Sequence, residues 1–245
     1  CIMDKQWFKD WFNTPYYHQL YFKRDENEAA AFIDKLIDYL KPNVHSFMLD
    51  IACGKGRHSV QLASKGFNVT GIDLSSDSIE EALQYETDKL HFFTHDMRLP
   101  FSINYFDYAF NFFTSFGYFD VKSDNQAAFD SLSAALKPGG VFLMDFFNPT
   151  YVIKYLVGQE TVIKQGISFE INRWAEDGFL YKSIDFTDQM EAYHFEEKVE
   201  LISKSDFLEY AVNSGLSSTG MLGDYQLNEF DDQNSPRMIF LWTKN

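Results

Sequence analysis

The chain of 245 residues carries 21 Lys and Arg side chains against 36 Asp and Glu, a formal net charge of −15 at pH 7. This balance argues against strong binding to nucleic-acid phosphates, and charged or turn residues interrupt every hydrophobic run before it reaches the length of a membrane span. Cys1 and Cys53 are too few for a disulfide framework, and the first residues do not resemble a signal peptide. We therefore expect a cytoplasmic protein with neither nucleic acid nor membrane as partner.

The first element that the sequence indicates is an amphipathic helix over 26–40, whose apolar residues recur at helical spacing before Lys41-Pro42 ends the run. From residue 46 onward, short apolar runs alternate with helical patterns. The expected strands cover 46–51, 67–73, 90–94, 106–113 and 141–146, and the expected helices cover 58–65, 76–86, with Ser76 or Asp77 as its cap, and 125–136.

A different pattern follows the fifth strand. Alternating, mixed polarity indicates three antiparallel strands over 167–174, 179–186 and 193–202. A helix over 204–213 and strands over 217–222 and 237–243 then resume the first pattern. The sequence predicts an α/β fold: a Rossmann-like, seven-stranded, mostly parallel sheet with helices on both faces and an inserted antiparallel β lid after strand five. We expect one structural domain, with its core at 46–149 and 203–245 and its lid at 150–202.

Two acidic residues stand where ligands bind in open α/β sheets, at the carboxyl ends of strands. Asp50 ends the first predicted strand, and Gly54 and Gly56 follow it in a turn whose backbone can approach a ligand closely. Asp73 ends the second predicted strand, where a carboxylate can accept hydrogen bonds from both hydroxyls of a ribose. This spacing indicates a nucleoside site.

Asp50 distinguishes between nucleoside ligands. Its carboxylate would repel a pyrophosphate but suits a ligand that carries an ammonium and a sulfonium, and Ser59 replaces the third glycine of a dinucleotide fingerprint. Asp96, after the third strand, can accept a hydrogen bond from an adenine amino group, with Met97 bordering the ring. A cationic adenosine ligand is favoured over NAD, and a nicotinamide-dependent oxidoreductase stays as a disfavoured alternative.

These motifs stand in the order typical of one enzyme family. Over residues 46–146 the chain resembles the class I S-adenosylmethionine-dependent methyltransferases. The segments that carry the resemblance are Asp50 to Gly56, Gly71-Ile72-Asp73-Leu74, His95-Asp96-Met97, Phe106-Asp107-Tyr108 and Leu136-Lys137-Pro138-Gly139-Gly140. The segments 53–59 and 113–118 are similar to those of bacterial small-molecule methyltransferases with a sheet-like lid.

The resemblance implies S-adenosyl-L-methionine as cofactor. It places Ala52 and Gly54 at the methionine part, Asp73 at the ribose, Leu74 and Met97 at the faces of the adenine, Asp96 at its amino group, and the Asn111 carbonyl at the methionine ammonium. The reaction that it implies is methyl transfer to a nitrogen or oxygen of a small-molecule acceptor. The alternative is a catalytically idle cofactor-binding module that acts through a protein partner.

The segment 14–25 resembles the flap that covers the cofactor in sugar N-methyltransferases, within an N-terminal helical region at 1–45. Tyr17 or Tyr21 would face the sulfonium, because an aromatic ring attracts a cation, and Arg24 would grip the methionine carboxylate. The alternative is a helix that merely packs on the sheet through the aromatic residues Trp7, Phe8, Trp11 and Phe12.

Methyl transfer from a sulfonium needs chiefly a correctly positioned acceptor. A general base would help a protonated amine or a hydroxyl, and the candidates by location are His18, Tyr118 and His194. The six histidines are too scattered for a metal site, so we expect no metal. Residues that can shape the acceptor site are Asp145, Arg173, Trp174 and Arg237, although Arg173 can instead pair with an acid such as Glu170.

Overall fold

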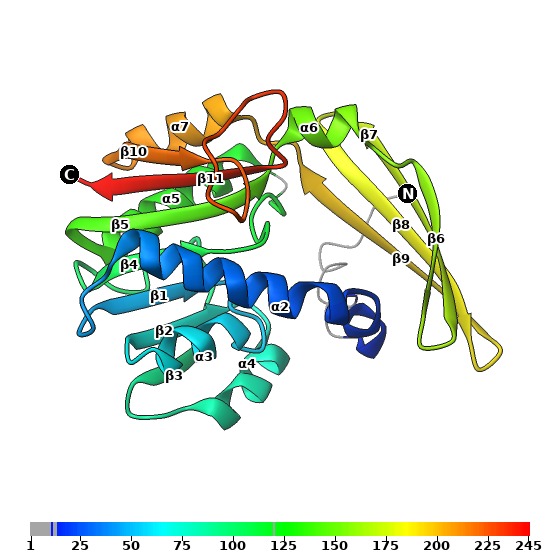
Figure 1. The fold of residues 1–245 in the computed structure, drawn as a ribbon, viewed down its shortest axis with the longest axis horizontal. Coiled ribbons are helices and arrows are strands. Elements are labelled where there is room, and N and C mark those ends of the chain that lie inside the picture. Colours follow the sequence, from blue (N-terminus) through cyan, green and yellow to red (C-terminus); the bar gives the residue numbers. More distant parts are fainter. Residues whose placement is uncertain (1–10, 12–13, 120) are drawn as a thin grey trace.

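The computed structural model describes residues 11, 14–119 and 121–245, with only the backbone described at 18 and 21–29. Seven strands form the main sheet (Figure 1): β1 (Phe47–Ile51), β2 (Asn68–Asp73), β3 (Leu90–Thr94), β4 (Phe106–Asn111), β5 (Leu136–Phe147), β10 (Leu216–Leu222) and β11 (Arg237–Lys244). Their order is β10-β11-β5-β4-β1-β2-β3. Only β11 runs against its neighbours, so the predicted Rossmann-like, mostly parallel sheet is confirmed.

Helices cover both faces of this sheet. One apolar cluster joins it to α2 (Pro15–Leu40), α3 (Arg57–Ser64) and α4 (Ser76–Ala82), which is followed by the 3-10 turn η1 (Leu83–Tyr85). A second cluster on the other face joins the sheet to α5 (Lys122–Ala135) and α7 (Lys204–Asn213), with the ring of Phe129 packed against those of Phe207 and Trp242.

The second sheet follows β5 and is antiparallel throughout, with the order β6-β7-β8-β9. Its strands are β6 (Gln159–Lys164), β7 (Ile167–Glu176), β8 (Phe179–Asp188) and β9 (Glu191–Glu200). The insertion after strand five was predicted, but β6 was not. β6 is an edge strand, and its alternation is carried by few apolar residues, with Val162 packing on the sheet's apolar cluster and Ile163 exposed.

The helix α2 begins eleven residues before the predicted start at residue 26, and Thr14 caps it by accepting a hydrogen bond from the backbone N–H of Tyr17. Its later half packs Phe32, Ile33 and Leu36 into the main core. Its first turns contact the second sheet instead, where the Tyr16 hydroxyl donates to Asp188 at 2.9 Å. This tertiary contact explains why apolar spacing alone missed the early turns. Figure 1 shows α2 reaching from the main sheet to the second sheet.

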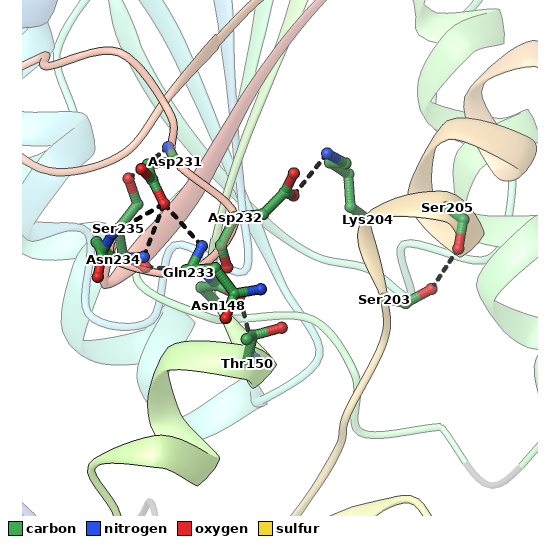
Figure 2. Close-up of polar contacts among 10 residues, drawn as sticks. All are labelled: Asn148, Thr150, Ser203, Lys204, Ser205, Asp231, Asp232, Gln233, Asn234 and Ser235. Atoms are coloured by element: carbon green, nitrogen blue, oxygen red, sulfur yellow. Dashed lines mark hydrogen bonds and ion pairs between the residues drawn. The ribbon is translucent and has the colours of Figure 1, made fainter.

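Asn148 fixes the passage from β5 to the second sheet (Figure 2). Its side-chain oxygen caps α6 (Pro149–Lys154) by accepting from Thr150 N, and its amide donates to the carbonyls of Asp232 and Ser235. The loop that supplies those carbonyls is also held by an ion pair between Asp232 and Lys204 at 2.6 Å. The first turn of the insertion is therefore tied to the loop between β10 and β11.

The fifth strand was predicted over 141–146, but β5 begins at Leu136. Two further predicted boundaries were wrong for local reasons. The cap of α4 is Ser75, not Ser76 or Asp77, because its hydroxyl accepts from Ser78 N at 3.1 Å. Strand β4 ends at Asn111 rather than at residue 113, because Phe113 and Thr114 have left-handed φ angles of 56° and 61°. Left-handed backbone cannot continue a strand, and the chain turns there toward α5.

Candidate cofactor and acceptor site

Asp50 lies at the carboxyl end of β1 with 1% of its surface exposed. Burial raises the pKa of its carboxyl to about 7, with the charge of Asp73 adding to the effect and a hydrogen bond from Ser59 opposing it. The Ser59 hydroxyl donates to Asp50 Oδ2 at 2.5 Å. Such a carboxylate gains most from a cation placed beside it, because a charge held out of water is costly until it is paired.

The turn after Asp50 is built from left-handed residues, with φ at 57° for Ala52, 54° for Gly54 and 81° for Gly56. A Cβ on Gly56 would lie 2.5 Å from the ring of Phe92, so that glycine is required by packing. A Cβ on Gly54 would meet no described atom within 4 Å. The turn is therefore open at Gly54, on the side where a ligand would approach.

Asp73 ends β2 and holds the same turn. Its Oδ2 accepts from Gly54 N and its Oδ1 from Ser75 N, both at 2.8 Å, while burial raises the pKa of the carboxyl. Each carboxylate oxygen can accept a second hydrogen bond, so a ribose can still be bound. The next side chain, Leu74, is 42% exposed and offers an apolar surface beside it.

Asp96 is held by Arg98. The guanidinium donates to both carboxylate oxygens, at 2.6 to 3.1 Å, and these bonds lower the pKa of Asp96. Arg98 also donates to Asp124 in the first turn of α5 at 2.6 Å and lies 5.2 Å from the centre of the Phe119 ring. The position predicted to meet the adenine amine is thus fixed by an ion pair that sequence reasoning did not anticipate. Neighbouring Met97 packs on the main core.

Asn111 lies at the end of β4, directly beside Ile51 of β1. It is fully buried, and its amide donates to the Ile51 carbonyl at 3.2 Å. None of the groups that the structure describes donates to its Oδ1. A buried acceptor of this kind is costly unless a donor reaches it, so an N–H or O–H of a ligand is the expected partner.

A buried ion pair links β5 and β11 next to the end of β4. Asp145 on β5 accepts from Arg237 Nε on β11 at 2.7 Å, from Tyr225 Oη at 3.0 Å and from Phe113 N at 2.9 Å. Arg237 also donates to Thr114 Oγ1 at 2.9 Å. This network fixes the left-handed turn that leads from β4 toward Tyr118.

Tyr118 lies where the second sheet meets the core. Preceding Gly117 has a φ of 88°, and its carbonyl accepts from Glu200 N at 2.8 Å. Burial raises the pKa of the Tyr118 hydroxyl, and Tyr17 and Glu197 lie close enough to add to that rise. Tyr17 of α2 and Glu197 of β9 both contact Trp11, so the start of α2 and the second sheet meet on the side of the core where Tyr118 lies.

Glu197 is the main residue that sequence reasoning missed. Its side chain is 17% exposed, and Oε1 accepts from Trp11 Nε1 at 2.7 Å. The signal was present in the alternation of β9, where Tyr193, Phe195 and Val199 face inward and a carboxylate interrupts the apolar positions. A charged residue on the buried face of a strand is a better marker of a site than a histidine near a loop.

Other predicted residues lie elsewhere. His194 is on the opposite face of β9 from Phe195, paired with Asp185 at 2.6 Å, so the structure does not bring it to Tyr118. Arg173 pairs with Glu160 and not with Glu170, which accepts from Thr161 instead. Trp174 stacks on Tyr181 away from Tyr118, at alternate strand positions. Three predicted residues, His18, Tyr21 and Arg24, lie on α2 with side chains outside the described atoms.

The strand order, the paired carboxylates and the open turn define a nucleoside-binding α/β enzyme fold. Residues 48–140 match the family described as "Methyltransferase domain". YqeM of Bacillus subtilis (strain 168), named as a methyltransferase, is 27% identical over 217 residues, which cover 78% of this chain and 85% of that protein. The crystal structure of an S-adenosylmethionine-dependent methyltransferase from Clostridium acetobutylicum ATCC 824 has a TM-score of 0.77 at 21% identity, covering 94% of this chain and 96% of that chain.

The dTDP-3-amino-3,6-dideoxy-alpha-D-glucopyranose N,N-dimethyltransferase of Streptomyces fradiae is 31% identical over 137 residues, which cover 53% of this chain and 52% of the relative. The chain thus spans about half the length of that relative. Residues 48–140 thus form a methyltransferase domain, the chain has the fold of S-adenosylmethionine-dependent methyltransferases, and its cofactor is S-adenosylmethionine. The residues fit this group, since the turn is open at Gly54, Asn111 Oδ1 needs a donor, and two carboxylates flank the turn.

Within residues 11, 14–119 and 121–245, no helix is both long and apolar enough to cross a membrane. Over the same part of the chain, no three His, Cys, Asp or Glu side chains are grouped so that they could hold a metal ion.

Proposed function

We propose that the enzyme transfers a methyl group to the nitrogen of a small-molecule amine. The observation that carries this proposal is the position of Glu197, a largely buried carboxylate that accepts from Trp11, whose ring packs against Tyr17 and Phe195. A carboxylate lined by aromatic rings attracts an ammonium group more than a neutral hydroxyl. The name of the Streptomyces fradiae relative, an aminosugar N,N-dimethyltransferase, agrees with an amine acceptor.

We assign the cofactor to the ends of β1, β2 and β4. Asp50 would balance the positive charge of the ligand, and Asp73 would accept from the ribose hydroxyls. Leu74 and Met97 would border the adenine, with Asp96 at its amino group. Asn111 would meet the methionine ammonium, through its buried Oδ1 or its backbone carbonyl. Of the flap residues, Tyr17 has a described contact, an edge-on packing against Trp11 at 5.6 Å.

The bound cofactor supplies an activated methyl group, so the chain has to position and deprotonate the acceptor. Glu197 would hold the amine as an ammonium and then receive its proton, which frees the nitrogen lone pair for in-line attack. Because burial raises the pKa of Tyr118, its hydroxyl stays protonated at neutral pH and acts as a hydrogen-bond donor, not as a base. The second sheet and the start of α2 would act as the lid that excludes water.

Methyl transfer to matched pairs of amines and alcohols tests the proposal. Products are measured by mass spectrometry, and we expect transfer to amines only. Glu197→Gln should lower kcat/KM by about 100-fold, in the range for loss of a general base. Glu196→Gln is the matched control, because this neighbour faces the other side of β9 and contacts His194. Cofactor binding without transfer to any amine or alcohol would instead favour an idle module that acts through a partner.

A further inference from the structure

Glu197 belongs to a row of charged side chains that crosses the inner face of the second sheet. The row consists of Glu160 on β6, Arg173 on β7, Lys182 on β8 and Glu197 on β9. Arg173 is paired in register with Lys182, and Lys182 with Glu197. Each carboxylate at an end of the row forms an ion pair with the cation next to it: Glu160 with Arg173, and Glu197 with Lys182 at 3.8 Å. We call these four residues the charged row.

The charged row lies between two apolar layers of the same face. On one side, Ile171 and Ile184 pack in the cluster that contains Trp11. On the other side, Leu180 and Val199 pack against the main core. The row is largely shielded from water, with the side chains of Lys182 and Arg173 only 11% and 22% exposed. Since Glu197 is a member, the row opens onto the proposed acceptor site beside Tyr118.

The order of charges along the row is unusual. The two carboxylates stand at its ends and the two cations are neighbours in its centre, on paired positions of adjacent strands. Like charges directly opposite each other destabilise a sheet, and burial increases that cost. Burial lowers the pKa of the Lys182 ammonium, the charge of Glu197 opposes this effect, and neighbouring Arg173 adds to it. Stability alone would not favour this arrangement, whereas an anion placed between the two cations would relieve it.

We propose that Arg173 and Lys182 bind an oxyanion of the methyl acceptor, a phosphoryl group or a carboxylate, so that the substrate is an amine that also carries an anion. This rests on the proposed amine methylation. Adjacent strands lie about 5 Å apart, so a planar guanidinium and a point-charged ammonium can grip one oxyanion from two sides. With Glu197 on the next strand, the amine would lie one strand spacing from Lys182.

Calorimetric titration with inorganic pyrophosphate and with succinate tests the site without any methyl transfer and separates the two oxyanion classes. We expect one of them to bind in the micromolar to millimolar range, and Lys182→Met or Arg173→Met to weaken it about tenfold or more, the value for loss of one strong charged contact. Glu197→Gln should strengthen it several-fold, because it removes a competing carboxylate. Lys198→Met is the control, since that lysine lies on the outer face over Phe179.

The double variant Lys182→Met/Glu197→Gln removes one charge of each sign, so it should fold even if a single variant does not. Circular dichroism checks its fold. Binding of neither probe, or equal binding of a probe by wild type and this folded variant, would overturn the oxyanion site. Failure of the amine proposal would look different. No amine would be methylated, while pyrophosphate or succinate would still bind and the variants would still change its affinity as expected. Methylation of neutral amines alone, with no probe bound, would leave only the amine proposal standing.

Discussion

The Ser59 hydroxyl donates a 2.5 Å hydrogen bond to Asp50, across the turn that is open at Gly54. Ser59 is the residue that replaces the third glycine of a dinucleotide fingerprint, and it lies fully buried in α3. One substitution therefore does two things. It fills the place where the fingerprint has a glycine for close packing of the helix on the strand, and it orients the carboxylate that favours a cationic ligand.

The pH dependence of cofactor binding follows from Asp50. Its pKa of about 7 means that the carboxyl is largely protonated below neutrality and charged above it. Because a cation is attracted by the charged form, affinity for S-adenosylmethionine should rise as pH increases from 6 to 8, by up to about tenfold per unit below the pKa. Titration calorimetry at three pH values measures it, and Asp50→Asn should bind weakly with a flat profile. A flat profile in the wild type would contradict this role.

The same group has an opposite effect on stability. A folded-state pKa raised above the ordinary value of an Asp means that the folded protein holds its proton where the unfolded chain has lost it. The contribution of Asp50 to the free energy of unfolding is therefore fully present at acid pH and is lost as pH rises through about 7. Without cofactor, Asp50→Asn should be more stable than wild type, by a margin that grows from pH 5 to 7 and then levels off. Urea titrations at each pH measure that margin, and a constant margin would contradict it.

The sequence was sufficient to find the strands of the main sheet because each parallel strand carries its own apolar run. Asp50 and Asp73 could be placed by their distance along the chain, since the carboxyl ends of parallel strands share one edge. It was insufficient for β6 and for the first turns of α2. Those elements depend on contacts far apart in the chain, such as that between Tyr16 and Asp188.

The acceptor side was harder to predict for a related reason. Arg173, Lys182 and Glu197 meet only through the pairing register of strands, and a register slip of one residue would move each to the other face. His194 shows the effect, because its neighbour Phe195 faces inward and it does not. The partner of Asp96 was near in sequence, yet Arg98 could equally have pointed to solvent.

The buried pair of Asp145 and Arg237 should be important for stability. Asp145→Asn leaves a guanidinium, only 17% exposed, without its carboxylate, which should lower the free energy of unfolding by about 3 to 5 kcal/mol. Chemical denaturation measures the change. Asp232→Ala, which removes the exposed ion pair to Lys204 drawn in Figure 2, serves as control and should cost at most about 1 kcal/mol. Equal effects of the two variants would mean that burial of the first pair has no energetic consequence.

Arg98 should influence the cofactor through Asp96. Its guanidinium fixes both oxygens of that carboxylate and ties them to Asp124. Arg98→Ala should leave the charge of Asp96 but lose its orientation, and the Kd for S-adenosylmethionine should rise by about three- to tenfold, an effect of about 1 kcal/mol. Adenosine should lose affinity equally, because the effect concerns the adenine. A loss seen with S-adenosylmethionine but not with adenosine would place the role of Asp96 elsewhere.

Asp73 should contribute most to binding of the ribose. Asp73→Ala removes the acceptor of the ribose hydroxyls together with the bonds from Gly54 N and Ser75 N that shape the turn. The free energy of cofactor binding should weaken by about 1 to 3 kcal/mol, or roughly 5- to 150-fold in Kd. Asp73→Asn keeps an oxygen for one backbone N–H and should lose less. Calorimetry with S-adenosylmethionine, its demethylated product and NAD gives the comparison. We expect the first two ligands to weaken in parallel, since they share the ribose, while NAD binds neither protein. Unchanged affinity in a folded Asp73→Ala variant would remove the ribose role and leave Asp73 as a residue that only holds the turn.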